Sequence, residues 1–403
     1  MYSMHICDSR SVVSLTLAYT LALTALFAFA PKLSQANQST TKSFQAAPHL
    51  EVAVDPRIEL LAAVQNLSDW EKFATPAGGW AKPNEPYRHD MDAWFAPYRN
   101  HPAVTQLNKL MESNFSYDAP VSWILHYDKL PTLKQQSPLD QDTLSRGGGQ
   151  AKLDALAAAF RDFAKVSHFQ EFFNKHRPLY ERLASSYRQT SPGDDALALI
   201  ECYYGERRAG YTVAIAPMFG GTNYGVRIPE GANIHIYNVG SPRYESDQYV
   251  FHRADQMSLM FHEFGHSFTN PAVDSDPVLR DKYIFLMPVI RYKMERQGYG
   301  SWTSVMYELM NRTNEIRLVQ LYGDTALADD LEKNYIDRGF FWLPYTLERL
   351  REYEANRRKY PSYKLFIGRM FDVLDETSPV IKDGRMVGVV PKKAQSGSLG
   401  TVN

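Results

Sequence analysis

The chain has 403 residues, of which 44% are hydrophobic and 22% are charged, and this globular composition supplies ample material for a core. Its 44 basic and 45 acidic residues leave a net charge of −1, which gives no electrostatic case for binding nucleic acid or an anionic membrane surface. The two cysteines, Cys7 and Cys202, argue against a small disulfide-stapled domain and exclude a cysteine-rich zinc site.

The first 36 residues are typical of an export signal. Arg10 precedes the uncharged run 11–30, and Ser34 and Ala36 place small residues where a signal peptidase requires them. We therefore expect cleavage after Ala36 and a periplasmic or secreted protein with no stable membrane association. The alternative is an uncleaved membrane anchor, because the apolar run is long for a signal core. Residues 37–50 are expected to form a flexible leader.

Helical patterns dominate the next part of the chain. Asp55 followed by Pro56 is typical of a helix start, with Asp55 as the cap. A second pattern covers residues 102–113. The longest covers residues 152–187, and Pro178 is expected to split or kink this helix.

The middle of the chain predicts a small sheet followed by a long helix. Residues 211–218, 223–228 and 233–239 are rich in β-forming residues, and the turn signals between them indicate hairpin connections and a mostly antiparallel sheet. A helical pattern then runs over residues 247–269, and Pro271 is expected to end it.

The last third is again helical and ends in a polar tail. Helices are predicted over residues 283–296, 301–322, 326–334, 342–360 and 362–376. The sequence thus predicts one α+β catalytic domain over residues 51–377, with helical N- and C-terminal parts, and a tail over 378–403 with a possible hairpin at Asp383-Gly384.

A metal-binding motif lies within the helix predicted before Pro271. His262-Glu263-Phe264-Gly265-His266 fits the pattern HExxH, in which two histidines one helical turn apart can converge on one ion. Zinc suits neutral imidazole ligands and keeps an open position for water, and Glu263 can accept the proton of that water. The apolar residues around the motif argue against a surface helix that carries unrelated histidines.

A catalytic zinc needs a third protein ligand, and the sequence leaves two main candidates for it. The predicted helix 301–322 carries Glu308 and Glu315, seven residues apart and so on nearly the same face. We favour Glu315 as the ligand, because Glu308 stands four residues before Arg312, a favourable spacing for a surface ion pair. Glu308 is the alternative, and the glutamate that does not bind zinc could orient a ligand.

Residues for binding substrate or a developing oxyanion are less defined. His235, on the predicted strand before the motif, could contact either, although a structural role fits it equally well. Tyr237, Tyr307 and Tyr322 are further candidates for stabilising an oxyanion.

Several stretches resemble a bacterial family of domains of unknown function that is similar to gluzincin-type zinc metallopeptidases. The resemblance spans roughly residues 51–375, and its stretches are 56–61 (PRIELL), 200–205 (IECYYG), 221–225 (GTNYG), 262–271 (HEFGHSFTNP), 314–315 (NE) and 353–357 (YEANR). It implies a mainly helical, zincin-like fold and a zinc site of His262, His266 and Glu315, with Glu263 as the base. It also implies an arginine four residues after the glutamate ligand, whereas Arg317 follows Glu315 by two.

The leading functional hypothesis is a zinc-dependent peptidase that acts on a peptide or protein substrate outside the cytoplasm. A second hypothesis keeps the zinc but changes the substrate to a non-peptide amide or a cell-wall peptide. A third is a catalytically silent, zinc-stabilised binding protein, and the presence of Glu263 argues against it, because a purely structural site needs no base.

Overall fold

The computed structural model describes residues 47–74, 80–220 and 222–392. The expected signal peptide and all but the last residues of the expected leader lie outside these ranges. Within them, no helix combines the length and the apolar character that crossing a membrane requires.

The described chain is a mainly helical α+β structure, as the sequence predicts. Its strands are β1 (Leu50–Ala53), β2 (Gly210–Ile215), β3 (Asn223–Glu230), β4 (Asn233–Gly240), β5 (Arg243–Glu245), β6 (Gln248–Val250), β7 (Thr377–Lys382) and β8 (Arg385–Pro391). The α-helices between β1 and β2 are α1 (Pro56–Leu67), α2 (Trp70–Ala74), α3 (Pro86–Phe95), α4 (Pro102–Met111), α5 (Asp118–Leu125), α6 (Gln141–Arg146), α7 (Gln150–Val166), α8 (Phe169–Thr190) and α9 (Gly193–Tyr204). Those between β6 and β7 are α10 (Arg253–Val273), α11 (Pro277–Asp281), α12 (Met287–Met294), α13 (Trp302–Tyr322), α14 (Thr325–Asp337), α15 (Leu343–Ala355) and α16 (Ile367–Glu376).

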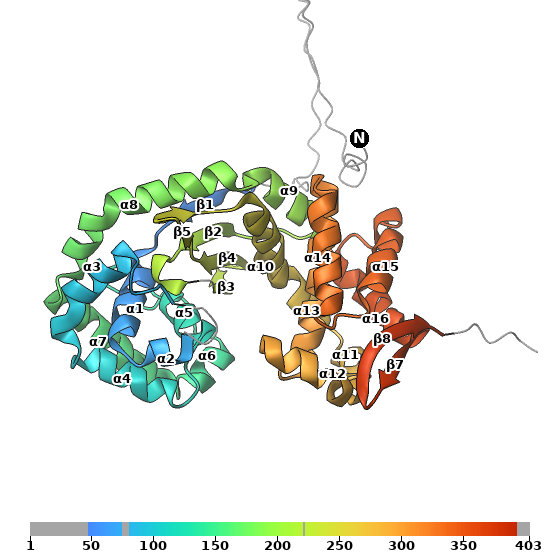
Figure 1. Cartoon of the computed structure of the whole chain (residues 1–403), viewed down its shortest axis with the longest axis horizontal. Coiled ribbons are helices and arrows are strands. Elements are labelled where there is room, and N and C mark those ends of the chain that lie inside the picture. The colour runs from blue at the N-terminus through green and yellow to red at the C-terminus, as the bar shows by residue number, and fades with distance from the viewer. Residues whose placement is uncertain (1–46, 75–79, 221, 393–403) are drawn as a thin grey trace, which may run out of the picture.

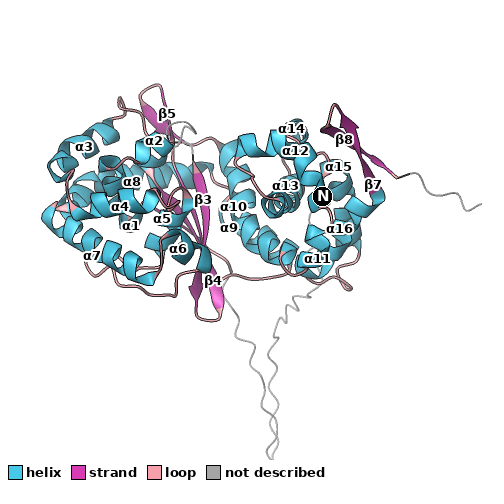
Figure 2. Cartoon of the chain, turned by 90° about the horizontal axis from the view of Figure 1, so that it is seen from below, coloured by secondary structure: helices cyan, strands magenta, loops and turns pink. Residues whose placement is uncertain are grey.

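The helices gather in two groups on either side of a central sheet. Helices α1 to α8 form one group and α11 to α16 the other, and β3 and β4 lie between them (Figures 1 and 2). Helix α10 packs against β3 and β4 and also against α13, so it joins the sheet to the C-terminal group.

The four-stranded sheet has the order β1-β2-β4-β3, and the prediction of a mostly antiparallel sheet is wrong for it. Strands β1 and β2 are parallel, as are β2 and β4, whereas β3 and β4 form the predicted antiparallel hairpin. Strand β2 is buried from Tyr211 to Ile215, as expected for a strand between parallel neighbours. Strand β3 lies at one edge of the sheet, and part of it alternates between buried and exposed residues.

Of the two effects predicted for Pro178, a split of the helix is wrong, because Pro178 lies inside the continuous helix α8. The helical region is interrupted instead between α7 and α8, at Ser167 and His168. His168 adopts a left-handed conformation with φ of 54°, which ends one helix and starts the next.

Helix α10 starts six residues later than predicted and continues through Pro271. The hairpin of β5 and β6 occupies the residues before it. Proline has no N–H to donate to the carbonyl of Ser267 one turn earlier. That carbonyl accepts from Arg208 Nη2 at 2.8 Å instead, which explains why the helix tolerates the proline.

The predicted hairpin near the C-terminus is confirmed. Strands β7 and β8 pair across Asp383 and Gly384, both of which have positive φ, as a tight two-residue turn requires. The phenol of Tyr292 on α12 donates to the carbonyl of Met386, so the hairpin is attached to the C-terminal group of helices.

Candidate metal centre

Two closely packed helices, α10 and α13, carry the residues of the motif and both candidate third ligands. A side chain at Gly265 would place its Cβ 2.6 Å from Asn311 Oδ1, so the helices approach this closely only because residue 265 is glycine. Asn311 in turn donates to the carbonyl of His262 at 2.9 Å. The spacing of the two helices at the motif is therefore fixed by a glycine contact and a hydrogen bond.

The two motif histidines converge with Glu308. The Nε2 atoms of His262 and His266 lie 3.1 Å apart. Glu308 Oε2 lies 3.7 Å from His262 Nε2, and Glu308 Oε1 lies 3.4 Å from His266 Nε2. These three side chains form a group whose donor atoms could hold a metal ion.

The other ring nitrogen of each histidine is occupied. His262 Nδ1 lies 2.9 Å from Glu315 Oε2, and His266 Nδ1 lies 3.0 Å from Asn270 Oδ1. Because both partners are oxygen acceptors, each Nδ1 carries the hydrogen, and the neutral rings then direct their Nε2 lone pairs at one another. In this arrangement the two Nε2 atoms and the carboxylate of Glu308 could serve as ligands of one metal ion.

Glu315 therefore lies beside the expected metal ligands rather than among them. Its side chain is fully buried. It accepts hydrogen bonds from Ser258 Oγ at 2.5 Å and from the Tyr335 phenol at 3.0 Å, in addition to the one from His262. The sequence favoured Glu315 as the ligand, whereas the structure places Glu308 at the Nε2 atoms and Glu315 at Nδ1 of His262.

The ion pair predicted between Glu308 and Arg312 is present at 2.8 Å, but it is buried rather than on the surface. The guanidinium of Arg312 lies over the ring of Tyr335, 4.1 Å from its centroid. Arg312 also donates to the phenol of Tyr299 at 3.0 Å. Arg312 therefore helps to fix the position of the Glu308 carboxylate.

The carboxylates make this position electrostatically favourable for positive charge. Burial alone would raise the pKa of Glu308, but His266, His262 and Arg312 outweigh it and hold that pKa well below its usual range. Burial likewise opposes the protonation of His262, yet Glu315, Glu308 and Glu263 together raise the pKa of His262. Burial raises and His262 and Arg312 lower the pKa of Glu315, with a net decrease.

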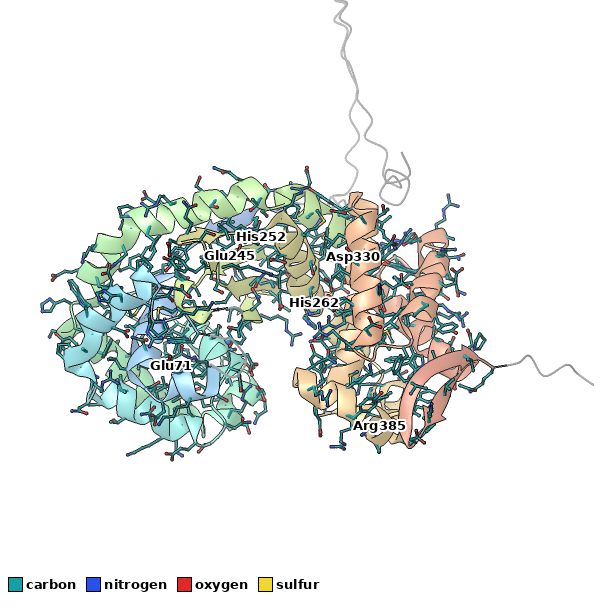
Figure 3. The ribbon with its side chains drawn as sticks, in the orientation of Figure 1. Glu71, Glu245, His252, His262, Asp330 and Arg385 are labelled. Carbon is teal, nitrogen blue, oxygen red and sulfur yellow. The ribbon has the colours of Figure 1, made fainter. Side chains whose placement is uncertain are left out.

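A cavity of about 540 Å³ opens onto the cluster. Helices α10 and α13, strand β3 and the start of α5 contribute its walls, and His262 lies at the opening between the two groups of helices (Figure 3). Glu263 lines the cavity opposite Gly225, where an added Cβ would lie 2.9 Å from Glu263 Oε2. Among the described residues, the carboxylate of Glu263 has neither a hydrogen bond nor an ion pair.

The other predicted site residues are dispersed. Tyr307 lines the cavity, and its phenol donates to Asp274 at 2.6 Å. His235 lies between Thr212 and Glu230 at 2.8 and 3.2 Å and stacks on Tyr237, away from the lining of the cavity.

The positions of Tyr322 and Tyr299 change which tyrosines could stabilise an oxyanion at the cavity. The phenol of Tyr322 donates to the carbonyl of Pro192, so it does not serve the cavity. Tyr299, which the sequence analysis missed, does line it, and burial raises the pKa of Tyr299 to about 12. No sequence pattern marks Tyr299, because it precedes α13 in an irregular segment.

The three converging side chains fit zinc by chemistry and by spacing. Two imidazole nitrogens and one carboxylate oxygen are a ligand set of catalytic zinc sites. Ligands of a tetrahedral zinc with bonds of about 2 Å lie roughly 3.3 Å apart. Here the two Nε2 atoms are 3.1 Å apart, and each lies 3.4 or 3.7 Å from a different oxygen of the Glu308 carboxylate.

Comparison with protein families identifies most of this structure as one unit. Residues 50–373 match the family described as a domain of unknown function, DUF4932. The chain belongs to this family. The matched range of the DUF4932 domain includes α10, α13 and all the residues of the cluster. No curated protein and no solved structure matches the chain significantly.

Proposed function

We propose that this DUF4932 protein is a zinc-dependent hydrolase that cleaves peptide bonds. The observation that carries the proposal is the convergence of His262, His266 and Glu308 at the wall of an open cavity that also contains Glu263. In this proposal His262, His266 and Glu308 bind zinc, Glu315 and Asn270 orient the imidazoles, and Glu263 is the general base.

The arrangement favours a catalytic site over a structural one. Structural zinc sites are closed by four protein ligands, whereas a catalytic site leaves a position for water or substrate. The described part of this chain supplies three ligands, and the cluster faces a cavity of about 540 Å³. Arg312, four residues after Glu308, also provides the arginine spacing that the resemblance to gluzincin-type peptidases implies.

In this proposal the metal and Glu263 would have different roles in the hydrolysis. Zinc, when bound, would polarise the substrate carbonyl and increase the acidity of the attacking water. Glu263 would accept the proton from that water and pass it to the departing amine. The free carboxylate of Glu263 and its place beside the histidines suit this role.

Strand β3 supports a peptide as the substrate. It pairs on one side with β4 and forms the edge of the sheet, so its other side can accept an extended chain by β-strand addition. It passes Glu263 at Gly225, where the lack of a side chain leaves room for the carboxylate of Glu263 beside the strand. Arg227, two residues further along β3, also lines the cavity.

The test combines metal content with hydrolysis. Purified protein is expected to hold about one zinc per chain by elemental analysis and to cleave casein or a peptide library. Glu263→Gln is expected to retain the zinc and lose cleavage, whereas His262→Ala is expected to lose both. Protein that holds no zinc after preparation without chelators would refute the proposal, and zinc without any peptide hydrolysis would leave only a non-peptide substrate or a binding role.

A further inference from the structure

The cavity at the metal cluster contains a permanent positive charge, the guanidinium of Arg227. Among the described residues that line this cavity, Arg227 is the only arginine or lysine. It is an exposed residue of β3, so its side chain is accessible to a ligand that enters the cavity. The proposed hydrolysis uses the metal ligands and Glu263 and gives Arg227 no role.

The pleat of β3 places Arg227 on the face that looks into the cavity. Gly225 and Arg227 are exposed, and the residues on either side of Arg227 are buried, so Gly225 and Arg227 share one face of the strand. Gly225 meets Glu263 on that face. Ile236, which pairs with Arg227 on β4, lines the same cavity. Two residues of a strand span about 7 Å, so Arg227 lies about this far along β3 from the point where the strand passes the base.

The charge of Arg227 also acts on the wall that α13 forms. Burial and the hydrogen bond to Asp274 raise the pKa of Tyr307, and the guanidinium groups of Arg280 and Arg227 oppose this rise. Tyr307 belongs to α13 and lines the cavity. The guanidinium of Arg227 is therefore close enough to this wall to attract an anion held between β3 and α13.

Arg227 has no counter-ion of its own. Among the described residues it makes neither a hydrogen bond nor an ion pair. Two of the carboxylates that line the cavity are paired with other arginines, Glu308 with Arg312 at 2.8 Å and Asp118 with Arg146 at 2.9 Å. An anionic ligand would therefore find the guanidinium of Arg227 available.

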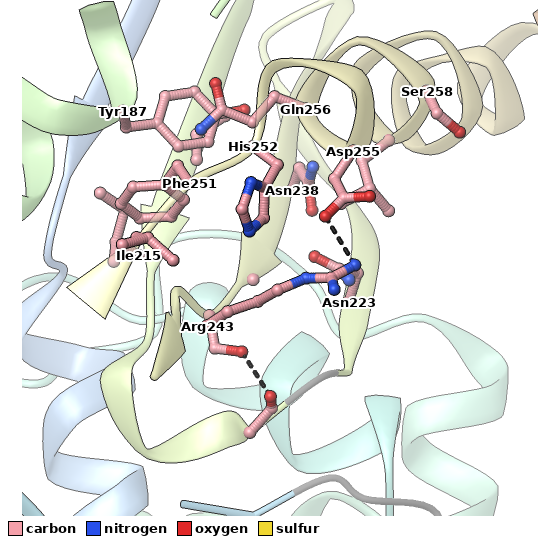
Figure 4. Close-up of a pocket in the computed structure, with 16 residues that line it drawn as sticks. Tyr187, Ile215, Asn223, Asn238, Arg243, Phe251, His252, Asp255, Gln256 and Ser258 are labelled. Carbon is pink, nitrogen blue, oxygen red and sulfur yellow. Dashed lines mark hydrogen bonds and ion pairs between the residues drawn. The ribbon is translucent and has the colours of Figure 1, made fainter. Parts of the chain in front are cut away.

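Arg243 in the adjoining cavity shows the opposite situation. This second cavity, of about 350 Å³, shares Asn223 with the first. Figure 4 shows Arg243 extended toward Asp255, with which it forms an ion pair at 2.6 Å. A guanidinium that is already paired gains little from a second anion, so Arg243 provides a matched comparison for Arg227.

We propose that Arg227 is a specificity residue that binds a carboxylate of the substrate within about two residues of the bond that is cleaved. The inference rests on the proposed function in taking a peptide as the ligand and in placing the cleaved bond beside Glu263. The anionic groups of an unmodified peptide are the side chains of aspartate and glutamate and the C-terminal carboxylate. A guanidinium can donate two parallel charge-assisted hydrogen bonds to a carboxylate, and a neutral amide cannot accept both.

The test measures binding and does not depend on turnover. The full chain carrying Glu263→Gln is titrated with N-terminally labelled, C-terminally amidated alanine hexapeptides that carry Glu, Gln or Lys at one position at a time. At one position, Glu is expected to tighten binding about tenfold over Gln, which has the same shape without the charge. A second set compares the free acid and the amide of the all-alanine peptide. Tighter binding of the free acid would identify the C-terminus as the source of the carboxylate and would equally support the inference.

Substitutions of the two arginines show which residue is responsible. Arg227→Gln is expected to abolish the preference for a carboxylate from either source. Arg227→Glu is expected to replace a preference for a Glu side chain with one for Lys at the same position. Arg243→Gln removes the same charge from the adjoining cavity and is expected to keep the preference, because Arg243 is already paired with Asp255. Thermal melting confirms that each variant is folded.

The outcomes separate this inference from the proposed function. Binding without a preference for a carboxylate, a preference that survives Arg227→Gln, or no binding of any peptide would overturn the inference, even if the wild-type chain hydrolyses peptides. A carboxylate preference that depends on Arg227, without any hydrolysis by the wild-type chain, would instead leave this site standing and refute the peptidase.

Discussion

The roles of Glu308 and Glu315 can be separated by replacing each with the isosteric glutamine. Both substitutions remove one negative charge from the same helix face and leave the side-chain volume unchanged. We expect Glu308→Gln to weaken zinc binding far more than Glu315→Gln, because Glu308 faces both Nε2 atoms and Glu315 contacts only Nδ1 of His262.

The expected magnitudes follow from these contacts. Structural zinc sites with four ligands bind with about 10–16 kcal/mol, so removing one anionic ligand costs about 3 kcal/mol, or a factor of roughly 100 to 1,000 in affinity. Loss of a residue that orients a metal-binding histidine costs about 10- to 100-fold. Glu315 also accepts from Ser258 and Tyr335, and a glutamine oxygen can retain part of this hydrogen bonding.

The affinities are measured by competition with a chromophoric zinc chelator at fixed pH, after thermal melting confirms that each variant is folded. Glu348→Gln is a matched control, because Glu348 is an exposed residue of α15 that pairs with Arg351. If Glu315→Gln weakens zinc binding more than Glu308→Gln, the assignment made from the sequence is right and the one made from the structure is refuted.

Three further predictions test the packing, the electrostatics and the base. Gly265→Ala should destabilise the protein by about 1–2 kcal/mol, because overpacking against Asn311 costs about 1–3 kcal/mol and the better helix propensity of alanine offsets up to about 1 kcal/mol. Thermal melting measures the change in stability. Gly300→Ala is the control, because an added Cβ at Gly300 meets open space. Burial raises the pKa of Glu59 from 4.5 to about 8, so the folded state holds an extra proton between these pH values. The contribution of Glu59 to the free energy of unfolding therefore falls by about 3–5 kcal/mol as pH rises through this window. Urea unfolding at pH 5 and 8.5 should show a decrease in the free energy of unfolding of the wild type that is smaller in Glu59→Gln, and equal decreases would contradict the prediction. Gly225→Ala should lower hydrolysis by up to about 100-fold while zinc is retained, because its Cβ would displace the carboxylate of Glu263, and unchanged turnover would rule out this contact.

Much of the helical architecture could be predicted from local signals. The capped start at Asp55 is confirmed by its hydrogen bond to the N–H of Arg57, and the helix predicted over residues 301–322 is confirmed as α13 with Ser301 as its cap. Caps and apolar periodicity act over one or two turns, so the sequence displays them directly.

The predictions of sheet pairing and of the end of α10 were wrong because residues far away in the sequence determine both features. Parallel pairing of β1 with β2 joins strands about 160 residues apart in the sequence, as the pair Glu51 and Thr212 shows, and no local pattern predicts it. The continuation of α10 through Pro271 depends on Arg208, which supplies the missing donor from a different segment. Local rules predict a helix end at a proline, and they fail where tertiary contacts satisfy the freed carbonyl.

The resemblance motifs outside the metal cluster support the site through packing. Glu201 of the IECYYG stretch accepts from the backbone N–H of Arg208 and from the phenol of Tyr211. The phenol of Tyr353 donates to the carbonyl of Tyr203 at 2.6 Å, so the YEANR stretch is attached to α9. Helix α9 packs against both α10 and α13, and these contacts hold the two helices of the cluster together.

The ambiguity between Glu308 and Glu315 has a physical origin in the geometry of one imidazole. Residues seven apart on a helix lie on one face about 10 Å from each other. Both glutamates of α13 therefore face α10, and His262 lies between them with its Nε2 toward Glu308 and its Nδ1 toward Glu315. Spacing alone cannot distinguish the two ends of that ring. What distinguishes them is His266, whose Nε2 lies 3.1 Å from Nε2 of His262 and thereby determines that the two rings converge on the side of Glu308.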